Sequence, residues 1–486
     1  MRKLLFLSIL CLLWVGWACT DEVETPIIVT TEDALFVGGD KIRISGRLIT
    51  NREVLASDHG FIVSETEAFS SPITISLGTK ESPGRFIGET SGLKISQNYW
   101  VKAFSVVEGQ EITGQAVRIQ MLTPVVESFT PKFAKVGDNI SLIGRNIPEG
   151  SKVFFGTQEA QVISNQFESR ITVRVPASGG TALVPIRIEV QGKSFQFAEQ
   201  FEYQSGKYTK VSDFPESFRV YNTTFFYNSA GFHVGLGLIR LGGNYTKIKR
   251  FNPQTGTWSE VAFPGNPRSY SFATANYLGG GALEVDRQIV SLERSFYKID
   301  GSAFTRLPDL PFVSVEQVAV ELNGMLYVMG GTLNSTTSVW RFSPTTNTWV
   351  QLPNAPVGLS SQNPFFTYQN KIYVASSTGD IYEFNPDGNA WTKKTTYPGS
   401  LGQGYGIAQV LGTKAYVGLY RRANDLYELD LNTFTWKIKN TIPGLPQSIN
   451  LGHFEYNGSI YFLRSPEISV FGDLPIELYK FEPNAI

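Results

Sequence analysis

The chain has 486 residues, of which 42% are hydrophobic, 13% aromatic and 17% charged, and its formal net charge is −1. This length indicates two to four domains, and the near-neutral charge argues against a nucleic-acid partner. With 46 Gly and 25 Pro, the composition is typical of short strands joined by tight turns, so we expect an all-β protein.

The first 18 residues predict a signal peptide. Arg2 and Lys3 precede an apolar run over residues 4–15 that is too short to span a bilayer permanently. Small residues then lead to Cys19, and this arrangement resembles the lipobox of bacterial lipoproteins. The resemblance implies that Cys19 is lipidated and attaches the protein to a membrane. An ordinary secretory signal is the alternative, although Cys19 would be the only cysteine left after cleavage.

An acidic linker, residues 19–24, follows the signal peptide. Its run Thr20-Asp21-Glu22-Val23-Glu24 resembles the surface-export signal of Bacteroidota lipoproteins. That resemblance implies a lipid-anchored protein of the outer membrane, exposed on the cell surface, and it leaves the leaflet open. No later segment has 18 consecutive apolar residues, so we expect no transmembrane span.

Residues 25–123 predict a first small β-sandwich. Apolar and polar residues alternate in Lys41–Gly46 and Gly60–Val63, which indicates half-buried antiparallel strands. The segments Asp58–Phe61 and Asn98–Ala103 resemble fibronectin type III-like modules of bacterial surface proteins. The resemblance implies an immunoglobulin-like fold.

Residues 124–204 predict a second sandwich. They resemble an IPT/TIG domain through Phe129-Thr130-Pro131, the glycine-bounded run Gly137–Asn146, Val153–Gly156 and the closing Phe201–Tyr203. The glycines of this pattern allow turns that residues with a Cβ resist. We interpret both sandwiches as spacers that support the domain after them.

A repeat fills residues 205–486. An aromatic residue recurs at intervals of 50, 46, 45, 42 and 45 residues, and a period of this size is typical of propellers and solenoids. The positions are Tyr208, Trp258, Phe304, Trp349, Trp391 and Trp436.

The clearest copy begins near Leu322. Its Asn323-Gly324 pair lies between two apolar runs, which is a strong hairpin signal because both residues tolerate positive φ. The following Tyr327, Gly330-Gly331 and Trp349 resemble the Kelch repeat, and no copy ends in the Trp-Asp pair of a WD40 blade. The resemblance implies blades of four antiparallel strands, named a to d from the centre outward.

The last copy ends at its third strand, Leu478–Phe481. Its missing fourth strand matches Lys207–Val211, at the start of the repeat region. The repeats therefore predict a six-bladed Kelch-type propeller that its first strand closes, which shields sheet edges from aggregation. The copy over residues 267–312 is the weakest, with Phe304 in place of Trp.

Loop lengths indicate which face of the propeller binds. The c–d spans are constant at seven residues, whereas four b–c spans measure 13, 9, 11 and 18 residues. Variable loops on a rigid frame usually carry function, and Kelch propellers commonly bind partners on this side. We therefore expect a ligand on the face of the b–c and d–a loops. Arg and aromatic residues suit sugar faces, carboxylates and protein hot spots. The candidates are Arg219, Tyr221, Arg268, Tyr270, Tyr405, Arg421, Arg422 and Arg464.

Candidate catalytic groups are sparse. The three histidines, His59, His233 and His453, lie in separate modules or blades without metal-ligand spacing. A galactose oxidase-like copper site requires a Cys-modified Tyr, and no Cys follows Cys19. No phosphate loop or nucleophile elbow is present. We expect no enzyme activity, no cofactor and no metal.

Three functions fit the sequence. We favour non-catalytic binding of a glycan or protein ligand at the cell surface. The alternatives are a sugar-active enzyme of the Kelch mutarotase type, with Arg and carboxylates at the propeller axis, and a structural component of an envelope complex. The ligand and the oligomeric state stay open.

Overall fold

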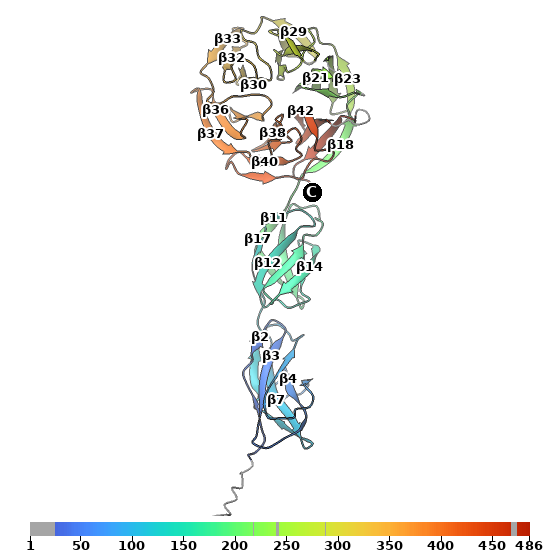
Figure 1. The fold of residues 1–486 in the computed structure, drawn as a ribbon, viewed down its shortest axis with the longest axis vertical. Coiled ribbons are helices and arrows are strands. Elements are labelled where there is room, and N and C mark those ends of the chain that lie inside the picture. Colours follow the sequence, from blue (N-terminus) through green and yellow to red (C-terminus); the bar gives the residue numbers. More distant parts are fainter. Residues whose placement is uncertain (1–24, 217, 240–242, 287, 468–473) are drawn as a thin grey trace, which may run out of the picture. The chain divides into compact units, whose positions relative to one another are not determined.

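The computed structural model describes residues 25–216, 218–239, 243–286, 288–467 and 474–486, and all the regular secondary structure in them is β-strand. The chain divides into two compact units after Tyr203 (Figure 1). Within this described part, no helix is long and apolar enough to cross a membrane. The all-β class is confirmed.

The first unit begins with an immunoglobulin-like sandwich. In β3 (Ile42–Ile49), Ile42, Ile44 and Leu48 are buried while Arg43 is exposed, so one side of the strand faces the core that both sheets share. One sheet contains β1 (Ile28–Thr31), β2 (Phe36–Val37), β3 and β6 (Gly84–Thr90), and the other contains β4 (Ala56–Ser64), β5 (Ile73–Ser76), β7 (Asn98–Val107), β8 (Gln110–Thr113) and β9 (Val117–Gln120).

The second sandwich of this unit is built around phenylalanines. Phe155 packs edge to face on Phe201 at 5.0 Å, and Phe129 packs on Phe197 at 5.5 Å, the arrangement that aromatic quadrupoles favour. Its strands, in order across the sheets, are β10 (Val125–Thr130), β12 (Asn139–Arg145), β15 (Arg170–Arg174), β14 (Gln158–Gln166), β13 (Lys152–Phe155), β16 (Leu183–Val190), β17 (Lys193–Tyr203) and β11 (Phe133–Ala134).

The second unit is the six-bladed propeller, with the described strands arranged around a central axis (Figure 1). Blade 1 contains β19 (Val220–Tyr221), β20 (Thr224–Asn228), β21 (Gly231–Ile239), β22 (Asn244–Asn252) and β23 (Thr257–Val261). Blade 2 contains β24 (Phe272–Ala273), β25 (Tyr277–Gly279), β28 (Phe296–Asp300) and β29 (Ala303–Leu307). Blade 3 contains β30 (Val318–Leu322), β31 (Met325–Met329), β32 (Val339–Ser343) and β33 (Thr348–Leu352).

The remaining blades repeat this order of strands. Blade 4 contains β34 (Phe365–Tyr368), β35 (Lys371–Ala375), β36 (Asp380–Asn385) and β37 (Ala390–Thr396). Blade 5 contains β38 (Ile407–Leu411), β39 (Lys414–Gly418), β40 (Leu426–Asp430) and β41 (Trp436–Ile438). Blade 6 contains β42 (Ser448–Tyr456), β43 (Ser459–Pro466), β44 (Glu477–Glu482) and β18 (Lys207–Asp213).

The hairpin predicted at Asn323-Gly324 is confirmed, and a second Asn-Gly pair in blade 6 forms the same kind of turn. Asn323 and Gly324 have φ values of 52° and 74°, and Asn457 and Gly458 have 49° and 71°. Two consecutive positive φ angles match the right-handed twist of the strands that they join. Blade 2 differs from the others, because its b–c connection carries an additional hairpin of β26 (Ala282–Val285) and β27 (Gln288–Leu292).

The predicted ring closure is confirmed. Strand β18 pairs antiparallel with β44, with Tyr208 opposite Phe481 and Lys210 opposite Tyr479. The ring of Tyr208 packs on Phe481 at 4.5 Å. The first strand of the unit thereby completes the last blade and covers its edge.

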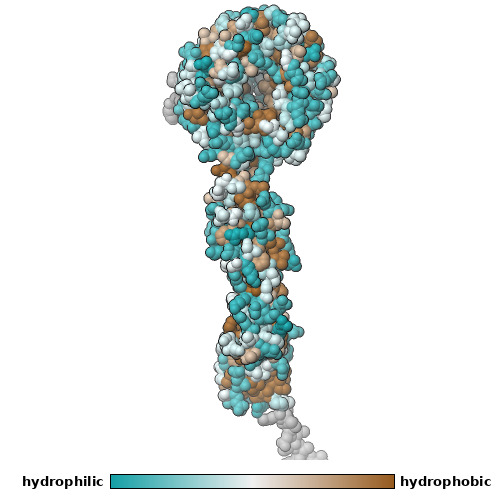
Figure 2. Space-filling model, turned by 180° about the vertical axis from the view of Figure 1, so that it is seen from behind, coloured by the Kyte–Doolittle hydropathy of each residue, from teal (hydrophilic) through white to brown (hydrophobic). Residues whose placement is uncertain are grey.

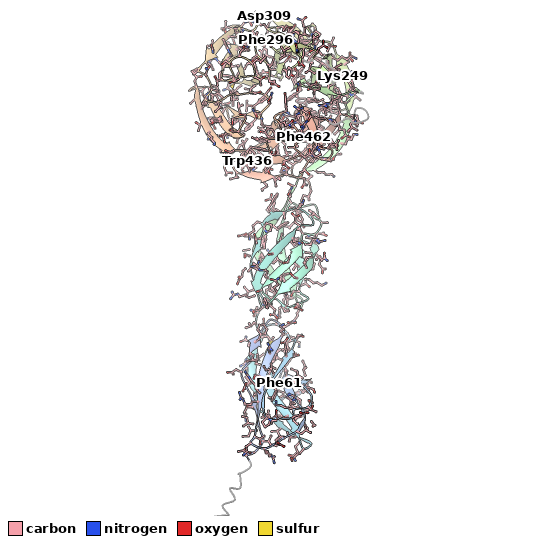
Figure 3. The ribbon with its side chains drawn as sticks, viewed as in Figure 1. Phe61, Lys249, Phe296, Asp309, Trp436 and Phe462 are labelled. Atoms are coloured by element: carbon pink, nitrogen blue, oxygen red, sulfur yellow. The ribbon has the colours of Figure 1, made fainter. Side chains whose placement is uncertain are left out.

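The repeated aromatic residues occupy equivalent positions on the outer strands. Trp349 lies opposite Phe342 in the register of blade 3, as Trp436 lies opposite Leu429 in blade 5. Trp349 also packs on Phe296 of blade 2 at 5.4 Å. Trp349 therefore fills space between neighbouring blades. Trp436 lies near the outer rim of the propeller in Figure 3.

Candidate functional site

A cavity of about 220 Å³ runs along the propeller axis. The innermost strands of the blades line it, and the space-filling and side-chain views both show the hollow centre of the propeller (Figures 2 and 3). One end lies among the d–a loops, which is the face that the loop lengths predicted. A second pocket shares residues with this cavity and reaches the a–b loops.

Six side chains at equivalent positions surround the end of the cavity on the d–a side. In blades 1 to 5 this side chain comes two or three residues before the first residue of the innermost strand that pairs in register with the next strand. In blade 6, Asn450 lies within β42 opposite Arg464, two residues before Gly452, where the register resumes after a shift. All six carry hydrogen-bonding groups, five of them line the cavity, and the remaining one, Gln362, contacts Glu316. This mouth ring consists of Asn222, Tyr270, Glu316, Gln362, Tyr405 and Asn450.

Hydrogen bonds connect the mouth ring from blade to blade. The amide of Tyr270 donates to the carbonyl of Asn222 at 3.3 Å, and the amide of Glu316 donates to Tyr270 at 3.1 Å. The side chain of Asn450 donates to the carbonyl of Tyr405 at 2.9 Å, which links blades 5 and 6. Blades 6 and 1 are linked beside the ring, where the hydroxyl of Thr223 donates to the carbonyl of Leu451 at 2.8 Å. Tyr270, Glu316 and Tyr405 have φ values of 59°, 56° and 56°. The connected blades hold the backbone in this strained conformation, which fixes the Cα and Cβ positions of these residues.

Glu316 is the central acceptor of the mouth ring. It is 7% exposed, and its carboxylate accepts hydrogen bonds from the hydroxyl of Tyr405 and the amide of Gln362, both at 2.6 Å. Thr332 donates to it at 2.8 Å. Burial raises the pKa of Tyr405 above its usual value, and the charge of Glu316 raises it further. The phenol therefore stays protonated and keeps donating to the carboxylate.

An arginine cluster adjoins the mouth ring. The carboxylate of Glu467, only 4% exposed, is contacted by Arg219 at 3.2 Å, by Nε of Arg421 at 2.7 Å and by Nε of Arg422 at 3.2 Å. Burial alone would raise the pKa of Glu467, but hydrogen bonds from Arg421 and Arg422 and the charge of Arg219 lower it. The guanidinium of Arg219 also lies 5.4 Å from the ring centre of Tyr221.

This cluster brings four of the predicted residues together, and the mouth ring contains two more, Tyr270 and Tyr405. The cluster meets the ring where the amide of Arg421 donates to the carbonyl of Gly404 at 2.8 Å. Arg422 and Arg421 are 48% and 31% exposed, so part of each guanidinium can reach a ligand. Three cations around one carboxylate leave this side of the mouth positively charged.

The two other predicted residues have structural positions. Arg268 is fully buried and donates to the carbonyls of Asn266 and Gly280, both at 3.1 Å. Arg464 lies inside β43 rather than in a loop, is 5% exposed and donates to the carbonyl of Leu419 at 2.9 Å. We therefore correct the prediction for both residues, because neither guanidinium has surface for a ligand.

A second set of equivalent residues lies three positions after the mouth ring in each blade. All six line the cavity, and the second pocket shares several of them, so they lie between its two ends. Five have hydrocarbon side chains, and we call the set the apolar collar. It consists of Phe225, Ala273, Ala319, Phe365, Ala408 and His453.

Sequence reasoning missed four mouth-ring residues, namely Asn222, Glu316, Gln362 and Asn450. Their signal is spacing, because the six members of the ring follow one another at 48, 46, 46, 43 and 45 residues. In the described residues no group of three or more His, Cys, Asp or Glu could hold a metal ion.

Fold and motif together define a Kelch-type propeller with an IPT/TIG domain. A Kelch motif model matches residues 316–356, which span blade 3, and an IPT/TIG domain model matches residues 124–203. An F-box/kelch-repeat protein of Arabidopsis thaliana is 31% identical over 93 residues, which are 18% of this chain and 25% of that protein. The chain thus matches only a quarter of the length of this relative.

Two solved structures are similar to the chain. YjhT aligns with 55% of this chain and 95% of its own, at 16% identity and a TM-score of 0.43. A structural genomics protein of unknown function from Bacteroides thetaiotaomicron aligns with 74% of this chain and 98% of its own, at 14% identity and a TM-score of 0.39.

Proposed function

We propose that the protein is a non-catalytic surface lipoprotein that binds a glycan at the mouth ring. The observation that carries this proposal is the ring itself, in which polar side chains at equivalent positions surround the open end of a cavity. A saccharide presents hydroxyls around its whole rim, so it needs donors and acceptors on several sides at once. The mouth ring offers amides, phenols and a carboxylate in that arrangement.

The size and rigidity of the site support the same proposal. A cavity of about 220 Å³ suits one terminal sugar residue better than a protein segment. Tyr270 and Tyr405 are only partly buried, so their rings are available to a sugar face. The inter-blade hydrogen bonds hold the ring in place before a ligand arrives, which reduces the entropic cost of binding.

Tyr270→Ala is expected to weaken glycan binding about tenfold or more, which corresponds to about 1.4 kcal/mol. Loss of the aromatic face and of the phenol removes contacts at the edge of the cavity. A glycan array identifies the ligand for the chain of residues 20–486, and titration of wild type and variant measures the change. Tyr368→Ala is the matched control, because Tyr368 lies at the end of β34 next to the a–b turn.

The contact between Glu316 and Tyr405 favours one alternative function, that of a sugar-active enzyme. A carboxylate 2.6 Å from a phenol at the axis could exchange protons with a sugar, as the mutarotase hypothesis requires. Accelerated exchange of sugar anomers by the protein, lost in Glu316→Gln, would contradict the non-catalytic assignment. An array without any glycan ligand would favour a protein partner or a role in an envelope complex, which pull-down from the cell envelope would identify.

The surface location is part of the proposal. Cys19 lies outside the described residues, and the lipobox resemblance supports its lipidation. Cys19→Ser is expected to abolish incorporation of a labelled fatty acid and to release the protein from the membrane fraction. Continued membrane association of the unlabelled variant would contradict anchoring through this residue.

A further inference from the structure

The apolar collar decides which chemical groups fit the inner part of the axial cavity. Ala273, Ala319 and Ala408 contribute only methyl groups, whereas Phe225 and Phe365 contribute rings. The free space therefore lies mainly beside blades 2, 3 and 5. These five side chains have no hydrogen-bonding atom, in contrast to the mouth ring three residues earlier.

His453 completes the collar without adding a charge. Its Nε2 lies 3.0 Å from the carbonyl oxygen of Ala408, so this nitrogen carries the proton that it donates. Burial lowers the pKa of His453 to about 4, and the imidazole is neutral at neutral pH. The collar thus has no ionised side chain, while the mouth ring has the carboxylate of Glu316.

We propose that the collar receives a methyl group at the leading end of a saccharide whose hydroxyls contact the mouth ring. This inference rests on the proposed function and names the ligand class. A hydroxyl placed among Ala273, Ala319 and Phe365 would lose its water without gaining a partner from them. A methyl group there gains hydrophobic burial instead. The methyl can come from an acetamido group or from C6 of a 6-deoxy sugar.

The structure itself suggests a variant that closes the collar. Phe225 and Phe365 occupy the positions in blades 1 and 4 that Ala319 occupies in blade 3. Because the fold already accepts Phe at this position twice, Ala319→Phe should fold and fill the space with a ring. Ala390→Phe is the matched control, since Ala390 is exposed on β37, the outer strand of blade 4.

The test uses glycans that differ only in their terminal residue. One pair ends in N-acetylglucosamine or glucose, and the other ends in fucose or galactose of the same chirality. Wild-type residues 20–486 are expected to bind the methyl-bearing member of one pair about fourfold more tightly or better, from about 0.8 kcal/mol per buried carbon. The preferred pair identifies the source of the methyl group.

In Ala319→Phe, the ratio of the affinities for the two members of the preferred pair is expected to fall to about one. In Ala390→Phe, this ratio is expected to stay at the wild-type value. Equal binding within both pairs, or preference for the hydroxyl member, overturns the inference and leaves the proposed function standing. An unchanged preference in Ala319→Phe overturns it as well. Absence of binding to every glycan overturns the proposed function and the inference with it.

Discussion

Acidification from pH 7 to about 4.5 is expected to cost the propeller about 2 kcal/mol through His233 alone. His233 is fully buried, its Nδ1 lies 3.1 Å from the carbonyl oxygen of Gly231 and its Nε2 lies 2.9 Å from Oγ of Ser302. Burial lowers the pKa of His233 to about 4. Between this value and the ordinary pKa near 6.5, the unfolded chain binds a proton that the folded chain does not, so stability falls as the pH falls.

The other blades indicate which residue can replace His233 in a comparison variant. In the other five blades a Tyr stands where blade 1 has His233, at Tyr277, Tyr327, Tyr373, Tyr416 and Tyr461. Urea unfolding measures the free energy of unfolding of wild type and His233→Tyr at both pH values. The difference between the two proteins separates the contribution of His233 from that of carboxylates that titrate in the same pH range. The variant should lose less stability on acidification, and an equal loss in both proteins would contradict the assignment.

Phe481→Ala is expected to lower the free energy of unfolding by about 3–5 kcal/mol. Phe481 is fully buried on β44, the strand that pairs with both β43 and β18. Its ring lies 4.5 Å from Tyr208 and 6.0 Å from Phe462, so the change leaves a cavity at the ring closure. Denaturant unfolding followed by tryptophan fluorescence measures the effect.

Val290→Ala is the control for this prediction. Val290 belongs to the same unit but is 56% exposed on β27, so its truncation should change stability by less than about 0.5 kcal/mol. A loss below about 1 kcal/mol in Phe481→Ala would show that the closing strand contributes less to stability than its burial implies.

The blades could be predicted because their signals are local. Asn323-Gly324 determines a turn, and Trp349 follows Phe342 by the same seven residues that separate the equivalent positions of other blades, so neither signal depends on distant residues. Burial of Arg268 and Arg464 could not be predicted, because it depends on carbonyl partners from other segments of the fold. The sequence around an arginine does not show whether carbonyl oxygens from other segments will surround its guanidinium in the fold.

The mouth ring escaped prediction for a different reason. Its members share a position and not a residue type, as Asn222, Glu316 and Tyr405 illustrate. A search for aromatic and basic residues therefore found Tyr270 and Tyr405 and passed over their neighbours in the ring. The spacing of 43 to 48 residues between ring members indicates equivalent positions, and the register of the paired strands establishes the equivalence.

The mouth ring also has a consequence for the orientation of a ligand. A sixfold ring with identical side chains would bind a ligand equally well in six orientations about the propeller axis. Here the blades present different groups, with a carboxylate on blade 3 and phenols on blades 2 and 5. One rotational setting can therefore satisfy a given pattern of donors and acceptors while the other five mismatch it. Selection can also change each position separately, so new preferences can evolve on an unaltered framework.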